Sequence, residues 1–355
     1  MDAPAYPLVF DPVLRDYIWG GRRLETLFGR RLPPGITAES WEISGHPTAA
    51  THVAQGTHAG SLLTDLTTTY GEQLCGTRAQ AMLARGRFPL LVKLLDAAQA
   101  LSLQVHPDNA YAAQHEQGEL GKTEMWYILH ADPDAHLIFG FARDVTCGEF
   151  RSALAAGAPE PLLHRLPVAA GDAVFIPAGS VHAIMQGIVL VEIQQNSDTT
   201  YRVWDWGRTG ADGTPRALHI DKACEVINFS QIRPGVCIPL PPGGAAGARS
   251  LVRTGGSDAS SLTHELLVDA PEFRIERVRM SAGCEVASEL DGATFEIWIC
   301  VEGSARVATA AGMAELPAVR SALVPAHAGT TYITAEAPVT LLRVYLADEK
   351  EKMSE

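Results

Sequence analysis

The stretch Gly171-Asp-Ala-Val-Phe-Ile-Pro177-Ala-Gly179-Ser-Val-His182-Ala-Ile-Met-Gln186 decides the fold of this chain. It consists of an apolar run, a turn that contains proline and glycine, and a second short apolar run. Proline fixes one backbone dihedral angle and glycine permits unusual ones, so the turn sets the direction in which the next strand begins. We therefore predict two strands joined by a tight turn, with the imidazole of His182 pointing inward.

A second imidazole lies upstream, in the Leu-Ser-Leu-Gln-Val-His-Pro-Asp segment of residues 101–108. Residues two apart on a strand share one face of the sheet. We therefore expect Ser102, Gln104 and His106 to project together, while the apolar residues between them point the other way.

A carboxylate opens a third apolar segment, Gly-Lys-Thr-Glu-Met-Trp-Tyr-Ile-Leu at residues 121–129, in which Glu124 precedes the apolar run. A single histidine in a strand is more often a hydrogen-bonded structural residue than a metal ligand. Three such groups beside apolar strands, where an unpaired charge is costly, favour a metal site. We predict that His106, Glu124 and His182 bind a divalent cation of borderline softness, with the amide of Gln104 completing or supporting the ligand set.

The composition is that of an ordinary globular protein, with 46% hydrophobic and 19% charged residues among 355. A chain of this length has room for two domains. The 28 basic residues against 41 acidic ones give a net charge of −13, which disfavours a nucleic-acid surface. The six cysteines form no Cys-x-x-Cys pair, and the sequence has neither a signal-peptide pattern nor a membrane-length apolar run. We expect a cytoplasmic protein without nucleic-acid or membrane partners, either a monomer or a homodimer.

The secondary-structure pattern is helical over residues 61–86 and then changes to short strands with a helical piece from residue 148. We predict strands at 90–96, 101–106, 124–130, 136–140, 173–177, 182–185, 188–195 and 200–206, and later at 264–269, 273–280, 294–301, 304–309, 322–325, 331–334 and 338–346. Many short strands with Gly, Pro, Asp and Asn between them indicate a barrel or a sandwich, and a jelly roll is one of the choices.

Residues 239–250 are rich in proline and glycine and are typical of a linker. Beyond them the strand, proline turn and strand pattern recurs around Pro325, and aligning the two turns puts Thr330 where His182 stands. We interpret this as a weak internal duplication in which only the first copy binds metal. The predicted domains are residues 1–238, which hold the metal site, the linker 239–250, and a second domain, 251–355, that lacks metal ligands.

Four further charged residues occur in or beside the predicted strands. Lys93 lies within an apolar strand, where a lysine must reach solvent, form an ion pair or serve a site. Alternation places Lys122 on the same side as Glu124. Glu192 and Arg202 belong to neighbouring strands and form either a surface ion pair or a polar patch at the rim of the metal pocket.

The spacing Gly171-x5-Pro177-x-Gly179-x2-His182 resembles the second cupin motif, and Gln104-x-His106 resembles the first cupin motif with glutamine in place of its first histidine. These motifs are similar to those of type I phosphomannose isomerases, specifically the short bacterial form. The resemblance includes Gly-Lys-Thr-Glu at 121–124 and Gln-Gln-Asn-Ser-Asp-Thr-Thr-Tyr-Arg at 194–202, spans most of residues 7–230 and continues more faintly beyond.

The resemblance implies a mainly β fold of two cupin-type jelly-roll barrels with a small helical segment. It also implies an enzyme with one zinc ion per chain that interconverts mannose 6-phosphate and fructose 6-phosphate, a small sugar phosphate being its partner. Carried over by position, His106, Glu124 and His182 bind the zinc, and Gln104 completes or supports the site.

The same resemblance assigns catalytic and substrate-binding roles. Arg202 falls on the arginine regarded as catalytic in the family, and Lys122 on the lysine before the glutamate ligand. Isomerisation needs a base that moves a proton between two carbons through a cis-enediol. Glu192 is our candidate base, with a zinc-bound water as its rival, and Lys122 with Ser102 is our candidate pair for the phosphate.

Three alternatives stay open at this point. One is a metal-cupin isomerase of another sugar, such as an unphosphorylated aldose or glucose 6-phosphate. Another is a non-catalytic sugar-binding cupin, because a fold alone does not fix function. A metal-dependent dioxygenase is disfavoured because its chemistry needs redox iron, although two histidines and a carboxylate would suit it as well.

Overall fold

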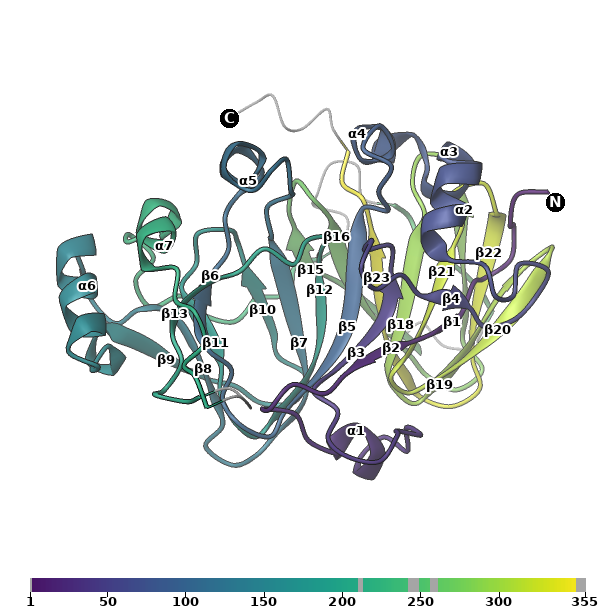
Figure 1. The fold of residues 1–355 in the computed structure, drawn as a ribbon. Helices are drawn as coiled ribbons and strands as arrows, with labels where there is room; N and C mark the ends of the chain where they lie inside the picture. The colour runs from purple at the N-terminus through teal and green to yellow at the C-terminus, as the bar shows by residue number, and fades with distance from the viewer. Residues whose placement is uncertain (1, 210–212, 242–248, 256–260, 349–355) are drawn as a thin grey trace. The chain divides into compact units, whose positions relative to one another are not determined.

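The computed structural model describes residues 2–209, 213–241, 249–255 and 261–348, and most of the predicted linker 239–250 lies outside these ranges. The described chain is mainly β, with short helices between and beside the strands (Figure 1). It divides into two compact units. We call Leu14–Ser40 with Lys93–Cys237 the central unit, and Met1–Val13, Trp41–Val92 and Ile238–Glu355 the terminal unit.

The central unit has strands in two sheets whose apolar faces pack together. One sheet has the order β10-β7-β12-β5-β3-β2 and the other β13-β6-β11-β8-β9; the boundary between the units falls inside β2, β3 and β5. The first sheet contains β2 (Val13–Arg15), β3 (Glu39–Ser44), β5 (Leu90–Ala97), β7 (Glu124–Ala131), β10 (Ala173–Ile176) and β12 (Ile188–Gln195). The second contains β6 (Leu103–Val105), β8 (His136–Phe141), β9 (Leu163–Pro167), β11 (His182–Ile184) and β13 (Tyr201–Trp204).

The core of the central unit lies between these two sheets. Trp126 and Val174 from the first sheet pack in one buried cluster with Leu137, Phe139 and Ile184 from the second. The helices are α1 (Arg23–Thr26), α5 (Asn109–His115), α6 (Cys147–Ala155), η2 (Glu160–Leu162) and α7 (Ile220–Val226). Side chains of α5, α6 and α7 pack in a second buried cluster with apolar residues of the second sheet, and Figure 1 shows α6 and α7 beside its strands. Both sheets are open in the strand pairing of the described residues.

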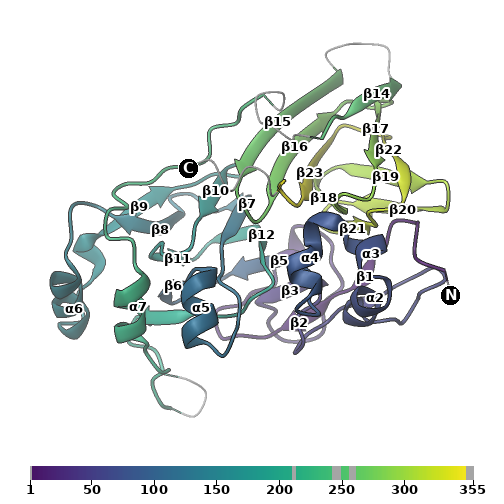
Figure 2. The same cartoon turned by 90° about the horizontal axis from the view of Figure 1, so that it is seen from above.

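The terminal unit also has two larger sheets, with the orders β14-β17-β22-β19-β20 and β15-β16-β23-β18-β21 (Figure 2). Their strands are β14 (Val252–Gly255), β15 (Leu262–Asp269), β16 (Arg274–Met280), β17 (Glu285–Leu290), β18 (Glu296–Glu302), β19 (Ser304–Thr309), β20 (Gly312–Pro317), β21 (Arg320–Val324), β22 (Gly329–Ala335) and β23 (Val339–Tyr345). The remaining elements are β1 (Phe10–Asp11), β4 (His52–Val53), α2 (Leu63–Tyr70), α3 (Glu72–Cys75), η1 (Thr77–Ala79) and α4 (Gln80–Leu83). No helix of the described residues has the length and apolar character needed to cross a membrane.

The turn between β10 and β11 has the backbone conformation that its glycine allows. Gly179 has a φ of +84°, and a Cβ at this position would lie 2.8 Å from the carbonyl oxygen of Val226. The amide of Gly179 donates a hydrogen bond of 2.8 Å to the carbonyl of His106. The turn therefore joins the end of β6 to the start of β11 and brings the two imidazoles close together.

A second glycine, Gly121, lets the segment that carries Glu124 lie close to the backbone that follows His106. A Cβ on Gly121 would meet the carbonyl carbon of Asp108 at 2.4 Å, so a larger residue would force the segments apart. The amide of Lys122 donates to the carbonyl of Pro107 at 3.0 Å, directly after His106. Glu124 then begins β7 beside the end of β6.

Strand register completes the placement of the polar side chains. Gln104 on β6 pairs with His182 on β11 on one side and with Arg202 on β13 on the other. In the opposite sheet Glu124 pairs with Ile176 of β10 and Gln194 of β12. The second sheet thus presents Gln104, His182 and Arg202 side by side, and the first sheet presents Glu124.

Candidate active site

His106, Glu124 and His182 converge at one point of the central unit. Their ligand atoms lie within 4.8 Å of one another, and all three side chains are buried. The Nε2 atoms of His106 and His182 lie 3.7 and 3.4 Å from the same Oε1 of Glu124. These are separations that a single ion bound by all three atoms can bridge.

Backbone carbonyls hold both imidazoles with Nε2 toward the carboxylate. Nδ1 of His106 lies 2.8 Å from the carbonyl of Thr199, and Nδ1 of His182 lies 3.0 Å from that of Ser180. A carbonyl can only accept, so each Nδ1 carries the proton and each Nε2 keeps its lone pair. Such carbonyl partners are typical of the histidines that bind metals.

The electrostatics of these three groups suit the binding of a cation. Burial and the nearby Lys122 lower the pKa of His182 to about 3, and burial lowers the pKa of His106 well below its usual value. Burial raises the pKa of Glu124 to about 7. Its Oε1 has no hydrogen-bond partner among the described residues. Two neutral imidazoles facing an unsatisfied carboxylate oxygen form a suitable donor set for zinc.

Gln104 and Lys122 lie next to these ligands. The side-chain amide of Gln104 is 3.2 Å from Nε2 of His182. Nζ of Lys122 is 2.9 Å from Oε2 of Glu124 and 3.3 Å from Nε2 of His106. Burial acts to lower the pKa of Lys122, but the charges of Glu124 and Glu192 raise it above its usual value. Lys122 is therefore a buried ammonium ion beside the candidate metal ligands.

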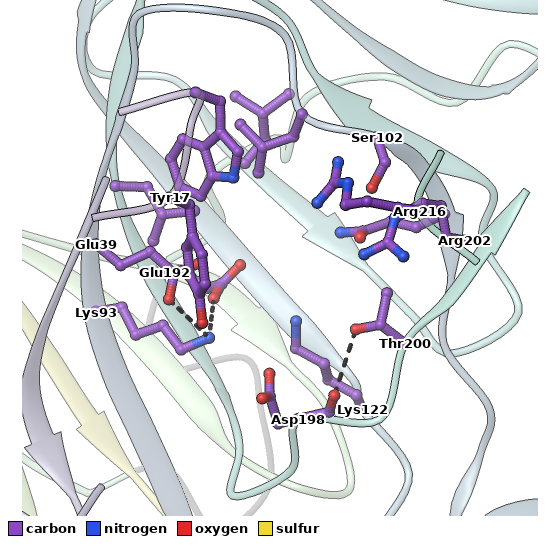
Figure 3. Close-up of a pocket in the computed structure, with 15 residues that line it drawn as sticks. Tyr17, Glu39, Lys93, Ser102, Lys122, Glu192, Asp198, Thr200, Arg202 and Arg216 are labelled. Carbon is purple, nitrogen blue, oxygen red and sulfur yellow. Dashed lines mark hydrogen bonds and ion pairs between the residues drawn. The ribbon is translucent and has the colours of Figure 1, made fainter. Parts of the chain in front are cut away.

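A pocket of about 320 Å³ opens beside this cluster (Figure 3). Eight residues were given a metal-binding, catalytic or substrate-binding role from the sequence. Five of them line the pocket, and the other three are the buried candidate ligands just described. The lining residues are Tyr17, Trp19, Glu39, Lys93, Leu95, Leu101, Ser102, Gln104, Lys122, Ile184, Glu192, Asp198, Thr200, Arg202 and Arg216. The structure therefore brings all eight together.

One side of the pocket carries a buried ion-pair network. Nζ of Lys93 lies 3.1 Å from Glu192 and 3.9 Å from Glu39. The second oxygen of Glu192 accepts a hydrogen bond of 3.1 Å from the indole N–H of Trp126. Burial acts to raise the pKa of Glu192, but the charges of Lys122 and Lys93 lower it below its usual value. Glu192 is thus held as a carboxylate inside the pocket.

The opposite side of the pocket is cationic, with Arg202, Arg216 and Ser102 beside one another in Figure 3. Arg202 donates to the carbonyl of Ala217 at 3.1 Å, and its buried Nε has no hydrogen-bond partner among the described residues. Burial and the charge of Arg216 lower the pKa of Arg202. This guanidinium is suited to receive an anion from the pocket.

Arg216 was not singled out from the sequence. Its guanidinium is held by both oxygens of Asp205, at 2.7 and 2.6 Å, and Asp205 also binds Arg208 at 2.5 Å. Arg216 lies outside any strand, so alternation could not place its side chain. Asp205 in the Trp-Asp-Trp segment was the one visible signal, because a carboxylate between two tryptophans, which are half-buried here, needs a partner.

Comparison with known proteins places this site in a family. A family model described as phosphomannose isomerase type I, catalytic domain, matches residues 8–136. The mannose-6-phosphate isomerase of Streptococcus mutans is 43% identical over 227 residues, which cover 64% of this chain and 69% of the relative. This chain belongs to the type I phosphomannose isomerase family.

Solved structures extend the likeness across the chain. The mannose 6-phosphate isomerase of Bacillus subtilis is 31% identical, with a TM-score of 0.79 over 95% of this chain and 99% of that one. A mannose 6-phosphate isomerase solved with bound zinc and yttrium has a TM-score of 0.70 over 96% and 100% of the two chains, and its 18% identity shows a shared fold alone. The family and the enzyme class predicted from the sequence, an isomerase, are confirmed.

Proposed function

We propose that this chain is a zinc-dependent isomerase that interconverts D-mannose 6-phosphate and D-fructose 6-phosphate through a cis-enediol. The observation that carries the proposal is the convergence of His106, Glu124 and His182 beside a pocket whose opposite side bears two guanidinium groups. A sugar phosphate has a reacting carbonyl at one end and a dianion at the other. The pocket offers a place for each.

The metal site suits zinc because it combines two neutral imidazoles with a carboxylate. The side-chain amide of Gln104 is in place to complete or support that set. When bound, zinc supplies a Lewis acid that stabilises negative charge on a substrate oxygen. We propose one ion per chain. Lys122 opposes the protonation of Glu124 that burial favours, through their 2.9 Å contact, and so helps to hold the carboxylate in the form that binds a cation.

The phosphate end of the substrate is best served by Ser102, Arg202 and Arg216. Guanidinium groups bind phosphate in a bidentate manner, and a hydroxyl adds a further donor. Lys122, which we paired with Ser102 from the sequence, points to the metal ligands and remains our second candidate for an anionic oxygen of the substrate. Arg202 is also placed to stabilise charge that develops on the sugar.

Glu192 remains our candidate for the base that moves the proton between C1 and C2. Its carboxylate lines the pocket and is kept ionised by Lys93, so it is in the form that can accept a proton. The contacts with Trp126 and Lys93 also fix its orientation, which a transfer between two carbons on one face of the substrate requires.

The change Glu192→Gln is expected to lower kcat by roughly 10² to 10⁴-fold, because an amide cannot accept the proton. Zinc content should stay at the wild-type level, since Glu192 is not among the three metal ligands. Steady-state kinetics and elemental analysis of the same preparation measure both quantities. Wild-type kcat in this variant would assign the proton transfer to another group.

For the fold, we propose that each unit is a cupin-type jelly roll, supported by the paired sheets and the family assignment. The division into residues 1–238, 239–250 and 251–355 stays a prediction from the sequence. So do the cytoplasmic location and the monomeric or homodimeric state.

A coupled assay on mannose 6-phosphate, with and without prior chelation, tests the proposed function. We expect turnover by the metal-loaded protein, its loss on chelation, and its return with one equivalent of zinc per chain. Unphosphorylated mannose should react far more slowly, because it leaves the guanidinium groups unpaired. Conversion of glucose 6-phosphate instead would support the isomerase of another sugar. Metal-loaded protein without any conversion would overturn the proposal in favour of a binding function.

A further inference from the structure

The two units share a sequence and register signature around one glutamate. In the central unit β7 opens with Glu124-Met-Trp126, and in the terminal unit β18 opens with Glu296-Ile-Trp298. Both carboxylates are fully buried at the first position of an apolar strand. Glu296 is therefore a candidate counterpart of the metal ligand Glu124.

Strand pairing supports this correspondence. Glu124 pairs with Ile176, and Glu296 pairs with Val324; each partner immediately precedes the proline of its turn. The second sheets of the two units also correspond. In the central unit β6 and β11 are the second and third strands of the order β13-β6-β11-β8-β9, and in the terminal unit β17 and β22 are the second and third strands of the order β14-β17-β22-β19-β20.

The other metal-binding side chains are replaced in the terminal unit. Where Gln104 pairs with His182, the terminal unit pairs Ser288 with Thr331, and both hydroxyl residues are buried. The neighbouring pair, Glu289 with Thr330, is more exposed, so the buried position that corresponds to His182 is that of Thr331 and not that of Thr330. The terminal unit has kept the carboxylate and lost the imidazole that faces it.

A guanidinium group lies where the carboxylate needs a cation. Nη2 of Arg343 donates to Glu296 at 2.6 Å and to Ser288 at 2.8 Å, and its Nη1 donates to Glu276 at 3.0 Å. Arg343 and both glutamates are fully buried. Arg249 also reaches Glu296 at 3.5 Å and His264 reaches Glu276 at 2.9 Å, but Arg343 is the one cation among these described contacts that binds both carboxylates. Its positive charge matters because buried carboxylates without a partner are very costly.

A buried ion pair joins the corresponding strands of both units, but the cation and the carboxylate have exchanged strands. In the central unit Lys93 on β5 binds Glu192 on the neighbouring β12 at 3.1 Å. In the terminal unit Glu276 on β16 binds Arg343 on the neighbouring β23 at 3.0 Å. The exchange puts the cationic side chain on the strand next to β18, from which it reaches the buried Glu296.

Two aromatic side chains complete the enclosure of the guanidinium. The carbon of the Arg343 guanidinium lies 5.7 Å from the ring centre of Trp298 and 5.1 Å from that of Tyr345. The indole N–H of Trp298 donates to Glu296 at 2.9 Å, and the hydroxyl of Tyr345 donates to Glu276 at 2.7 Å. Both aromatic faces and both carboxylates favour a planar cation.

We propose that the terminal unit contains a degenerate cation site, lined by Glu276, Glu296, Trp298 and Tyr345, in which the guanidinium of Arg343 permanently replaces a metal ion. The statement that Arg343 stands in for a metal ion rests on the proposed function, because it assumes a metal at Glu124. The contacts that hold the guanidinium do not depend on that function. Truncation of Arg343 should leave a cavity that selects a small planar cation from solution.

Chemical rescue tests this proposal. Arg343→Ala is expected to lower the melting temperature by roughly 5 to 10 °C, because it removes the cation that two buried carboxylates share and leaves Glu296 with Arg249 at 3.5 Å and Glu276 with His264 at 2.9 Å. Low millimolar guanidinium chloride should raise the melting temperature of this variant above its value in equimolar sodium chloride. Arg306→Ala is the matched control, since Arg306 also binds two carboxylates, Glu315 and Glu336, but at the surface. It should show neither effect.

The absence of a guanidinium effect in folded Arg343→Ala would overturn the proposal. If that variant does not fold, Arg343→Met can be compared with the same change combined with Glu276→Gln and Glu296→Gln. Neutral amides do not need the cation, so the triple variant should melt higher than the single one. An equal or lower melting temperature would refute the cation role. Sugar turnover does not enter these measurements, so they stand apart from a failure of the proposed function.

Discussion

Replacing His182 with alanine is expected to weaken zinc binding by at least about 100-fold and to lower turnover of mannose 6-phosphate by roughly 10³-fold. His182 is fully buried, its Nδ1 is held by the carbonyl of Ser180, and its Nε2 lies 3.4 Å from Glu124. The tight turn at Gly179 sets where β11 begins and so fixes the position of this imidazole. Zinc content after dialysis and the coupled assay measure the two effects.

The matched control for this change is His136→Ala. His136 lies on β8, the strand next to β11, but its ring is partly exposed and contacts the carbonyl of Asp134. Zinc content and turnover should both stay near wild type in this control. If His182→Ala kept its full zinc content and its activity, the proposed ligand set would be wrong.

Replacing Arg202 with alanine is expected to lower kcat by about 10² to 10³-fold while zinc is retained. Losses of this size follow the removal of one positioned donor that stabilises developing charge. The guanidinium lines the pocket with its Nε unpaired among the described residues, so a substrate oxygen is the partner it lacks. Arg202→Lys should restore little activity, because an ammonium cannot reproduce the planar fork.

Arg216→Ala provides the contrast that separates chemistry from binding. Arg216 is already paired with Asp205 and lies beside Arg202 in the pocket. We expect its loss to raise KM for the phosphorylated sugar more than it lowers kcat.

The same kcat in wild type and Arg202→Ala would remove Arg202 from the mechanism, even if KM had changed.

Strands with strong apolar patterns were predictable from the sequence. The segments predicted at 124–130 and 188–195 correspond to β7 (Glu124–Ala131) and β12 (Ile188–Gln195). The sequence analysis missed β17, whose Glu285–Leu290 segment alternates polar and small residues, and α5 of Asn109–His115, which is a short helix. The helix depends on a local cap, because the side chain of Asp108 accepts from the amide of Tyr111.

Alternation along strands also predicted much of the candidate site. It placed Ser102, Gln104 and His106 on one face and Lys122 beside Glu124. The first three residues lie at the pocket or the metal cluster, and the Lys122 ammonium contacts Glu124. These side chains were predictable because two-residue periodicity is a local property of the backbone.

The sequence by itself determined the residues proposed to bind a metal ion, the turn that directs His182, and the family to which the chain belongs. Only the tertiary structure decided that Arg216 joins Arg202 in the pocket and that Arg343 lies between two buried glutamates. Those contacts join segments far apart in the chain, and their partners are chosen by sheet register and by the demand that every buried charge be paired. Local patterns carry neither piece of information.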